Sequence, residues 1–231
     1  RALRKAFGGL VVFDSLDFRL ARGRRHAVIG PNGAGKSTFV NLVTGLLPPT
    51  AGSVRLNGHD VTRASPRERV KAGLARTFQI NTLFATLTPL QSVTVAVCQR
   101  EGVDRPSLRS FARRGPTVEQ AFAMLERFGL AAIADTPVAQ LPYGQQRMLE
   151  VAMALALEPT VLLLDEPAAG LSTAQGEALF DELLRQAADT TLLFIEHDMA
   201  LVFRYADRVS VFAGGALIAE GEPEAIRADP K

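Results

Sequence analysis

The segment that most constrains this chain is a glycine-rich octapeptide at residues 30–37, which reads Gly-Pro-Asn-Gly-Ala-Gly-Lys-Ser. It fits the pattern G-x-x-x-x-G-K-[ST] and lies between an apolar stretch at 26–29 and a segment of helical spacing at 38–46. Glycines let backbone N–H groups turn inward around phosphate oxygens, and the N-terminus of the following helix adds partial positive charge. The segment therefore predicts a strand, a phosphate-binding turn and a helix in succession.

The side chains of this loop indicate a nucleotide bound with magnesium. We expect Lys36 to reach the β- and γ-phosphates of ATP, and the Ser37 hydroxyl to ligate Mg²⁺. ATP and Mg²⁺ are thus the predicted cofactors. The other residues expected to hold phosphate oxygens are Asn32, Gly33, Ala34, Gly35 and Thr38.

Two acidic residues, Asp165 and Glu166, follow the apolar run 161–164 and predict the second half of such a site. Open α/β sheets bind ligands at the carboxyl ends of their strands, where this pair falls. We expect Asp165 to hold Mg²⁺, directly or through water, and Glu166 to orient or deprotonate the attacking water. Taken alone, such a run is as often only a strand that meets a turn. The loop at 30–37 makes the magnesium site the better interpretation.

Charge and cysteine content narrow the class of protein. The chain has 26 basic and 24 acidic residues, a formal charge of +2, so the overall field gives no reason to expect nucleic acid as a partner. A single cysteine, Cys98, cannot form an internal disulfide and suits a reducing compartment. The apolar runs are far shorter than the roughly 18 residues of a membrane-spanning helix. We therefore expect a cytoplasmic location.

Strands and helices alternate along most of the chain, which predicts an α/β fold with a mostly parallel sheet covered by helices. The segments 3–7 and 16–20 alternate apolar and polar residues and predict an antiparallel edge unit. Between about 89 and 157 the pattern is helical, so we expect an inserted helical subdomain at 81–156 and a catalytic core formed by 1–80 and 157–231. The arginine-rich stretch 99–117 is interpreted as an exposed loop, with an anion or lipid-headgroup contact as the alternative.

Taken together, these motifs resemble the ATPase subunits of ABC transporters, which have a P-loop NTPase fold, over nearly the whole chain. The resemblance implies that Gln79 contacts Mg²⁺ and the attacking water, and that His197 hydrogen-bonds the γ-phosphate and Glu166. It also implies that the segment Leu-Pro-Tyr-Gly-Gln at 141–145 is the family signature, which contacts the nucleotide of a second subunit. The signature residues concerned are Pro142, Tyr143, Gly144 and Gln145.

Two positions in the resemblance carry open questions. Pro142 stands where the family usually has serine and offers neither a hydroxyl nor a backbone N–H, so Gly144 and Gln145 would have to supply the donors. Phe7 lies where the family places an aromatic ring that stacks on adenine, although a core role for Phe7 and the neighbouring Phe13 are both alternatives.

Several strings are similar to those of the branched-chain amino-acid import group, notably Tyr-Gly-Gln-Gln-Arg at 143–147 and Glu-Pro-Ala-Ala-Gly at 166–170. The resemblance implies an ATP hydrolase that powers import, in a homo- or heterodimer of ATPase subunits. Its partners would be membrane permeases and, indirectly, a substrate-binding protein, which places it on the inner face of the cell membrane. One alternative is a lipid or lipopolysaccharide system. The other is a soluble relative acting on DNA or the ribosome, which the chain's single phosphate loop and lack of heptads disfavour.

Overall fold

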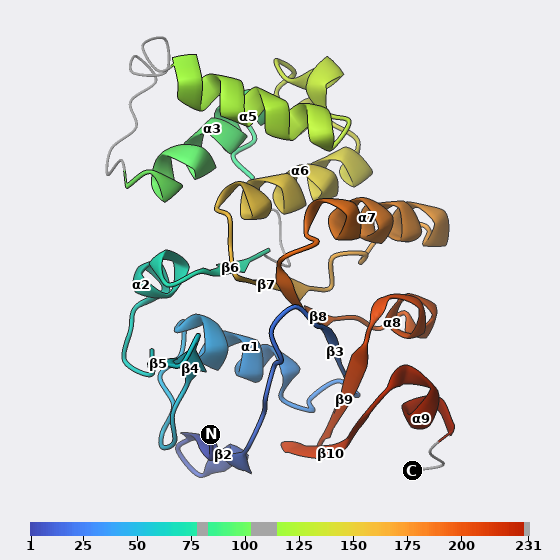
Figure 1. Ribbon diagram of the computed structural model, residues 1–231. Helices are drawn as coiled ribbons and strands as arrows, with labels where there is room; N and C mark the ends of the chain where they lie inside the picture. Colours follow the sequence, from blue (N-terminus) through green and yellow to red (C-terminus); the bar gives the residue numbers. More distant parts are fainter. Residues whose placement is uncertain (78–82, 103–114, 229–231) are drawn as a thin grey trace. The chain divides into compact units, whose positions relative to one another are not determined.

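The computed structural model describes residues 1–77, 83–102 and 115–228 (Figure 1). Their contacts form two compact units. The sheet unit consists of Arg1–Arg76, Thr160–Pro167 and Asp189–Lys231, and the helical unit of Thr77–Pro159 and Ala168–Ala188. This grouping differs from the division expected from the sequence, because residues 168–188 fall with the helices rather than with the catalytic core.

The sheet unit contains a six-stranded sheet in the order β10-β9-β3-β8-β7-β6. All neighbouring strands are parallel except β10, which runs antiparallel to β9. This arrangement confirms the predicted α/β class with a mostly parallel sheet. The strands are β3 (Arg25–Ile29), β6 (Leu74–Arg76), β7 (Val161–Asp165), β8 (Thr191–Ile195), β9 (Arg208–Ala213) and β10 (Ala216–Gly221).

An antiparallel hairpin of β1 (Leu3–Phe7) and β2 (Leu10–Leu16) precedes this sheet. Gly8 and Gly9 form its two-residue turn, with Phe7 opposite Leu10, which is a common hairpin connection. The strand predicted at 16–20 is therefore wrong, although an antiparallel edge unit is present. Phe18 and Leu20 in that segment do pack against the core, so their alternation reflects burial without strand pairing.

Aromatic rings fill the core between the hairpin, the sheet and helix α1 (Lys36–Thr44). Phe39 on α1 packs edge-on against Phe212 on β9, with ring centroids 5.3 Å apart, and Phe13 on β2 meets Phe212 at 6.1 Å. These rings are all fully buried. They seat α1 against the sheet, and edge-on aromatic pairs add directional packing to the burial of apolar area.

The C-terminal end of α1 is held by Arg69 on α2 (Pro66–Lys71), which is 1% exposed. Its guanidinium donates to the carbonyl oxygens of Leu42 and Val43 at 2.7 and 2.6 Å, and also to those of Thr62 and Ala64. Because the last carbonyls of a helix lack intrahelical partners, a buried cation there satisfies them and complements the helix dipole. A short β4–β5 ribbon (Arg55–Leu56 and His59–Asp60) lies between the two helices in sequence.

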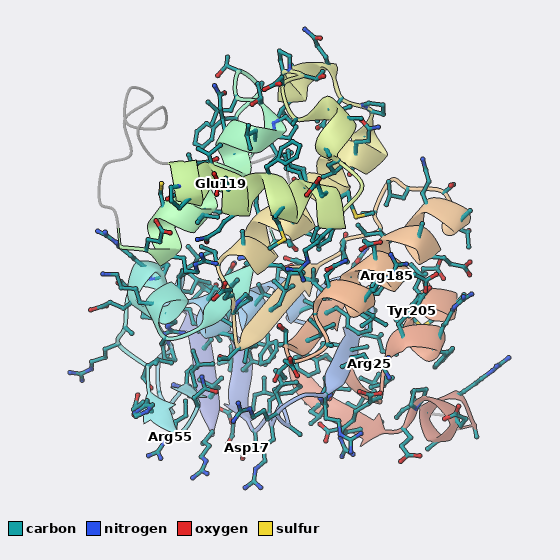
Figure 2. All side chains as sticks on the ribbon, turned by 45° about the horizontal axis from the view of Figure 1, so that its top comes forward. Asp17, Arg25, Arg55, Glu119, Arg185 and Tyr205 are labelled. Carbon is teal, nitrogen blue, oxygen red and sulfur yellow. The ribbon has the colours of Figure 1, made fainter. Side chains whose placement is uncertain are left out.

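The start of β3 carries two polar interactions, one partly exposed and one buried. Arg25, labelled in Figure 2, forms a partly exposed ion pair with Asp207, just before β9. His26 is 1% exposed, with Nε2 2.8 Å from the Ser210 hydroxyl, which in turn donates to Glu220 at 2.9 Å. Burial lowers the pKa of His26 to about 4, despite the charge of Glu220. The imidazole is therefore neutral in the folded protein at neutral pH.

The helical unit contains four longer helices that pack side by side (Figure 1). α7 belongs with them because Arg127 at the end of α5 donates to Gln186 at 2.7 Å. α3 and α5 extend into the stretch 99–117 expected to be a loop, whose residues 103–114 lie outside the described residues. The helices are α3 (Pro89–Arg100), α5 (Gly115–Arg127), α6 (Tyr143–Ala156) and α7 (Thr173–Gln186), with single turns at η1 (Ala131–Ile133) and η2 (Val138–Gln140).

Two shorter helices complete the sheet unit, α8 (Met199–Tyr205) and α9 (Pro223–Ala228). Within the described ranges, no helix combines the length and the apolar character needed to cross a membrane.

Candidate functional site

The loop between β3 and α1 takes a shape that only glycine allows at two positions. Gly30 has φ 149°, and a Cβ there would lie 2.1 Å from the carbonyl oxygen of Phe212. Gly35 has φ 99°, and a Cβ there would lie 2.7 Å from Cζ of Phe13. The loop therefore lies so close to the core at Gly30 and Gly35 that a side chain would not fit at either position. This explains the spacing of the glycines in the motif.

Lys36 closes this loop on itself. Its side chain is 7% exposed, and Nζ donates to the carbonyl oxygens of Gly30 at 2.6 Å and Pro31 at 3.0 Å. Burial lowers its pKa, and the charges of Glu166 and Asp165 oppose that effect. Both acids thus favour the charged form of the ammonium group.

The remaining loop residues differ in exposure. Asn32, Gly33 and Ser37 are exposed, whereas Ala34 is buried and its N–H donates to the carbonyl of Pro31 at 3.2 Å. Helix α1 starts after Gly35, which has no side chain to cap the helix. The first amides of α1 therefore remain for an anionic ligand, including that of Thr38, which is half-buried.

Asp165 ends β7 and is 3% exposed. Arg76, at the end of the neighbouring β6, donates from Nη2 to its Oδ2 at 2.8 Å and from Nη1 to Oδ1 of Asn41 on α1 at 3.0 Å. Burial raises the pKa of Asp165, and Arg76 counteracts this. The sequence interpretation assigned no role to Arg76. Its position three residues before Gln79, at the end of a strand parallel to β7, was the signal that could have indicated one.

Glu166 follows in a left-handed backbone conformation, with φ 51°. Its N–H donates to the carbonyl of Ile195 at 2.9 Å, which ties the turn to the end of β8. His197 lies at that same strand end, and its Nε2 is 2.8 Å from Oε1 of Glu166. A non-glycine residue with positive φ is uncommon, and such positions often occur at functional sites.

The next residue, Asp198, is the N-terminal cap of the following helix. Its carboxylate accepts from the N–H groups of Ala200 and Leu201 and so begins α8. His197 thus lies between the end of β8 and the start of α8, and its side chain is 48% exposed. The structure thus brings together Lys36, Asp165, Glu166 and His197 at the carboxyl ends of the parallel strands.

The two aromatic candidates for adenine stacking separate clearly. Phe13 is fully buried in the core, so it has no free face for a base. Phe7 is 46% exposed, with Nζ of Lys5 4.7 Å from its ring centroid. Phe7 is therefore the one of the two that can stack. Gln79, the remaining predicted residue of this site, lies outside the described residues.

The segment predicted to contact a second subunit begins α6 in the helical unit. Pro142 is the N-terminal cap, and its carbonyl accepts the N–H of Gln145 at 2.9 Å. The first two amides of an α-helix, here those of Tyr143 and Gly144, have no acceptor within the helix. Of the two donors expected from the sequence, the backbone of Gly144 is thus available and that of Gln145 is already engaged.

Comparison with known proteins agrees with this geometry. The family described as ABC transporter matches residues 13–169. The high-affinity branched-chain amino acid transport ATP-binding protein LivG of Salmonella typhimurium is 38% identical over 236 residues, covering 99% of this chain and 92% of LivG.

Solved structures give the same result. A nucleotide-free ATP-binding cassette from an ABC transporter superposes with a TM-score of 0.85 at 30% identity, covering 99% of this chain and 94% of that one. The ADP conformation of the cassette MJ1267 has a TM-score of 0.84 at 31% identity, covering 99% and 93%.

Proposed function

Because this chain belongs to the ABC transporter family and is the ATP-binding subunit of a transporter, we propose that Glu166 and His197 form the hydrolytic pair of its ATPase site. The observation that carries the proposal is the 2.8 Å contact between His197 Nε2 and Glu166 Oε1 at adjoining strand ends. In that position Glu166 would accept a proton from the attacking water, and His197 would hold the carboxylate and the γ-phosphate in place.

The phosphate end of ATP would lie against the loop at 30–37. Lys36 would exchange its bonds to Gly30 and Pro31 for phosphate oxygens, and the uncapped amides of α1 would accept the remaining negative charge. Phe7 would stack on the adenine ring, since its ring has an exposed face. Gln79 would add a contact to the metal and water.

Mg²⁺ fits the oxygen ligands available here. Within the described residues, no three Asp, Glu, His or Cys side chains converge on one point to hold a metal. Mg²⁺ is commonly bound through one or two protein oxygens together with substrate phosphates. The Ser37 hydroxyl and the Asp165 carboxylate would supply those protein oxygens, and the metal would neutralise phosphate charge.

A second ATPase subunit, identical or closely related, would complete the site. Pro142 cannot donate and Gln145 is engaged within its own turn, so the backbone N–H of Gly144, with that of Tyr143, would face the γ-phosphate held by the partner. Two ATP molecules would then join the two chains, and hydrolysis would separate them.

The relatives support a proposal for the cargo and the location. We propose import of branched-chain or related amino acids, driven by this subunit on the inner face of the membrane with permease subunits and a binding protein. The 38% identity to LivG across 99% of the chain supports this over lipid or lipopolysaccharide transport.

The catalytic assignment is tested by Glu166→Gln, which keeps the shape of the side chain but removes its basicity. We expect ATP binding to persist and hydrolysis to fall by about 10²- to 10⁴-fold, the usual contribution of a general base. The matched control is Glu224→Gln, an exposed glutamate on α9. Wild-type turnover in the Glu166 variant would refute the assignment.

The cargo is tested by reconstituting the subunit with its permeases and binding protein in vesicles. We expect leucine, isoleucine or valine to stimulate ATP hydrolysis. Stimulation by lipid alone, with no response to any amino acid, would contradict amino-acid import while leaving the ATPase assignment intact.

A further inference from the structure

The side chain of Tyr143 links two segments of the helical unit that are distant in sequence. Its hydroxyl donates to the carbonyl oxygen of Ala169 at 2.9 Å, in the loop that follows Glu166. The same hydroxyl accepts a hydrogen bond from Nε of Arg147 at 2.8 Å. A hydroxyl that both donates and accepts is held in one orientation, so the tyrosine ring is fixed between α6 and the loop.

The backbone of the loop is shaped to receive this ring. Gly170 has φ 79°, and a Cβ there would lie 3.1 Å from Cε1 of Tyr143 and 3.4 Å from its hydroxyl oxygen. A side chain at Gly170 would therefore press on the ring. The next turn is also fixed, because Ser172 and Gln175 form a capping box at the start of α7.

Arg147 is itself anchored in the interior of the helical unit. It pairs with Glu150 at 2.8 Å, and both side chains are 6% exposed. Burial raises the pKa of Glu150, and Arg147 offsets this. The guanidinium also lies 5.1 Å from the centroid of the Tyr143 ring. The donor that orients the Tyr143 hydroxyl is thus rigid, because a buried ion pair is costly to separate.

We infer that the side chain of Tyr143 is a positioning group rather than a nucleotide contact, whereas its backbone N–H remains in the signature turn: the hydroxyl fastens the signature turn 142–145 to the loop 168–172. This inference rests on the proposed function. In the proposed dimer the signature turn faces the partner's ATP, whereas Glu166 acts on the chain's own ATP. Ala169 is only three residues beyond Glu166. The hydrogen bond of the Tyr143 hydroxyl therefore connects the turn that faces the partner's ATP to the loop next to the base that acts on the chain's own ATP.

The first test is hydrogen exchange on the full chain in the absence of nucleotide. Tyr143→Phe keeps the ring and removes the hydroxyl, and we expect amides in 168–172 to exchange about five- to tenfold faster, as for the loss of one hydrogen bond. Tyr205→Phe is the matched control, because Tyr205 on α8 is the chain's other tyrosine (Figure 2). Unchanged exchange in 168–172 of the Tyr143 variant would overturn the inference.

The second test separates positioning from general stability. We expect Tyr143→Phe to leave the dissociation constant of a fluorescent ATP analogue within about twofold of wild type, and to lower kcat of the assembled ATPase by about tenfold. A weaker affinity with unchanged kcat would instead identify Tyr143 as a direct nucleotide contact. If Glu166→Gln also hydrolyses ATP normally, the proposed function fails first; if only the tyrosine variant is normal, this inference alone fails.

A second variant covers the case in which loss of the hydroxyl impairs folding. Gly170→Ala would push a methyl group onto the Tyr143 ring, and we expect the same gain in exchange and loss of kcat. Gly129→Ala is its control in the same unit, because Gly129 also has positive φ, 67°, but a Cβ there would meet nothing within 4 Å. Equal behaviour of the two alanine variants would contradict the inference.

Discussion

The guanidinium of Arg76 donates to the Asp165 carboxylate at 2.8 Å, and the two side chains are 13% and 3% exposed. The residue proposed to hold magnesium is therefore already paired with a cation of its own chain. Because Arg76 also bonds Asn41 on α1, this one side chain joins β6, β7 and the helix of the phosphate loop.

Removing this cation should destabilise the protein. For Arg76→Gln in nucleotide-free protein we expect a loss of about 3 kcal/mol, because a buried carboxylate loses its hydrogen-bonded partner. Urea unfolding would measure it, with Arg4→Gln as the control, since both side chains of the pair of Arg4 with Asp14 are exposed and such a pair is worth less than about 1 kcal/mol. In a double-mutant cycle with Asp165→Asn, additive effects would show that the pair is not coupled.

His197 should matter for turnover more than for binding. For His197→Ala we expect kcat to fall by about 10²-fold, because Glu166 loses the group that holds it, while nucleotide affinity stays close to wild type. Phosphate release under saturating ATP measures this. His59→Ala, at an exposed histidine on β5, should behave as wild type, and equal rates for both variants would remove His197 from the site.

The phosphate loop should tolerate added methyl groups unequally. Gly33→Ala introduces a positive-φ alanine with no neighbour within 4 Å and should cost about 1 kcal/mol. Gly35→Ala places a methyl group 2.7 Å from Phe13 and should cost about 2–4 kcal/mol. Unfolding in the absence of nucleotide compares them, and similar losses would mean that the loop does not press on the core.

His26 should make the protein sensitive to acid. Its pKa is about 4 in the folded state and near 6.5 when unfolded, so the unfolded chain binds the proton first as the pH falls. The contribution of neutral His26 to the free energy of unfolding is fully present above pH 6.5 and is lost toward pH 4. About 2 kcal/mol of it is lost at pH 5. His26→Gln should flatten this dependence of unfolding free energy between pH 7.5 and 5, whereas His59→Gln should not. A wild-type slope in the His26 variant would contradict the prediction.

Local signals in the sequence predicted much of the fold. The run 161–165 is apolar and ends in an acid, and it forms β7 at those residues. The segment of helical spacing at 38–46 likewise lies almost wholly in α1, which spans Lys36–Thr44. The prediction failed at 16–20, where apolar alternation marks residues that pack against the core without a partner strand. It also missed the strand Leu10–Leu16, which pairs with β1.

Residue types at fixed short spacings were enough to identify the phosphate loop, the acidic pair after β7 and the family. The three-dimensional structure was needed to show that Arg76 pairs with Asp165, that Phe13 is buried while Phe7 is exposed, and that the Tyr143 hydroxyl reaches Ala169. Each of these features depends on residues from separate segments of the chain. The distances between such residues depend on how strands and helices pack, which no local pattern of residue types specifies.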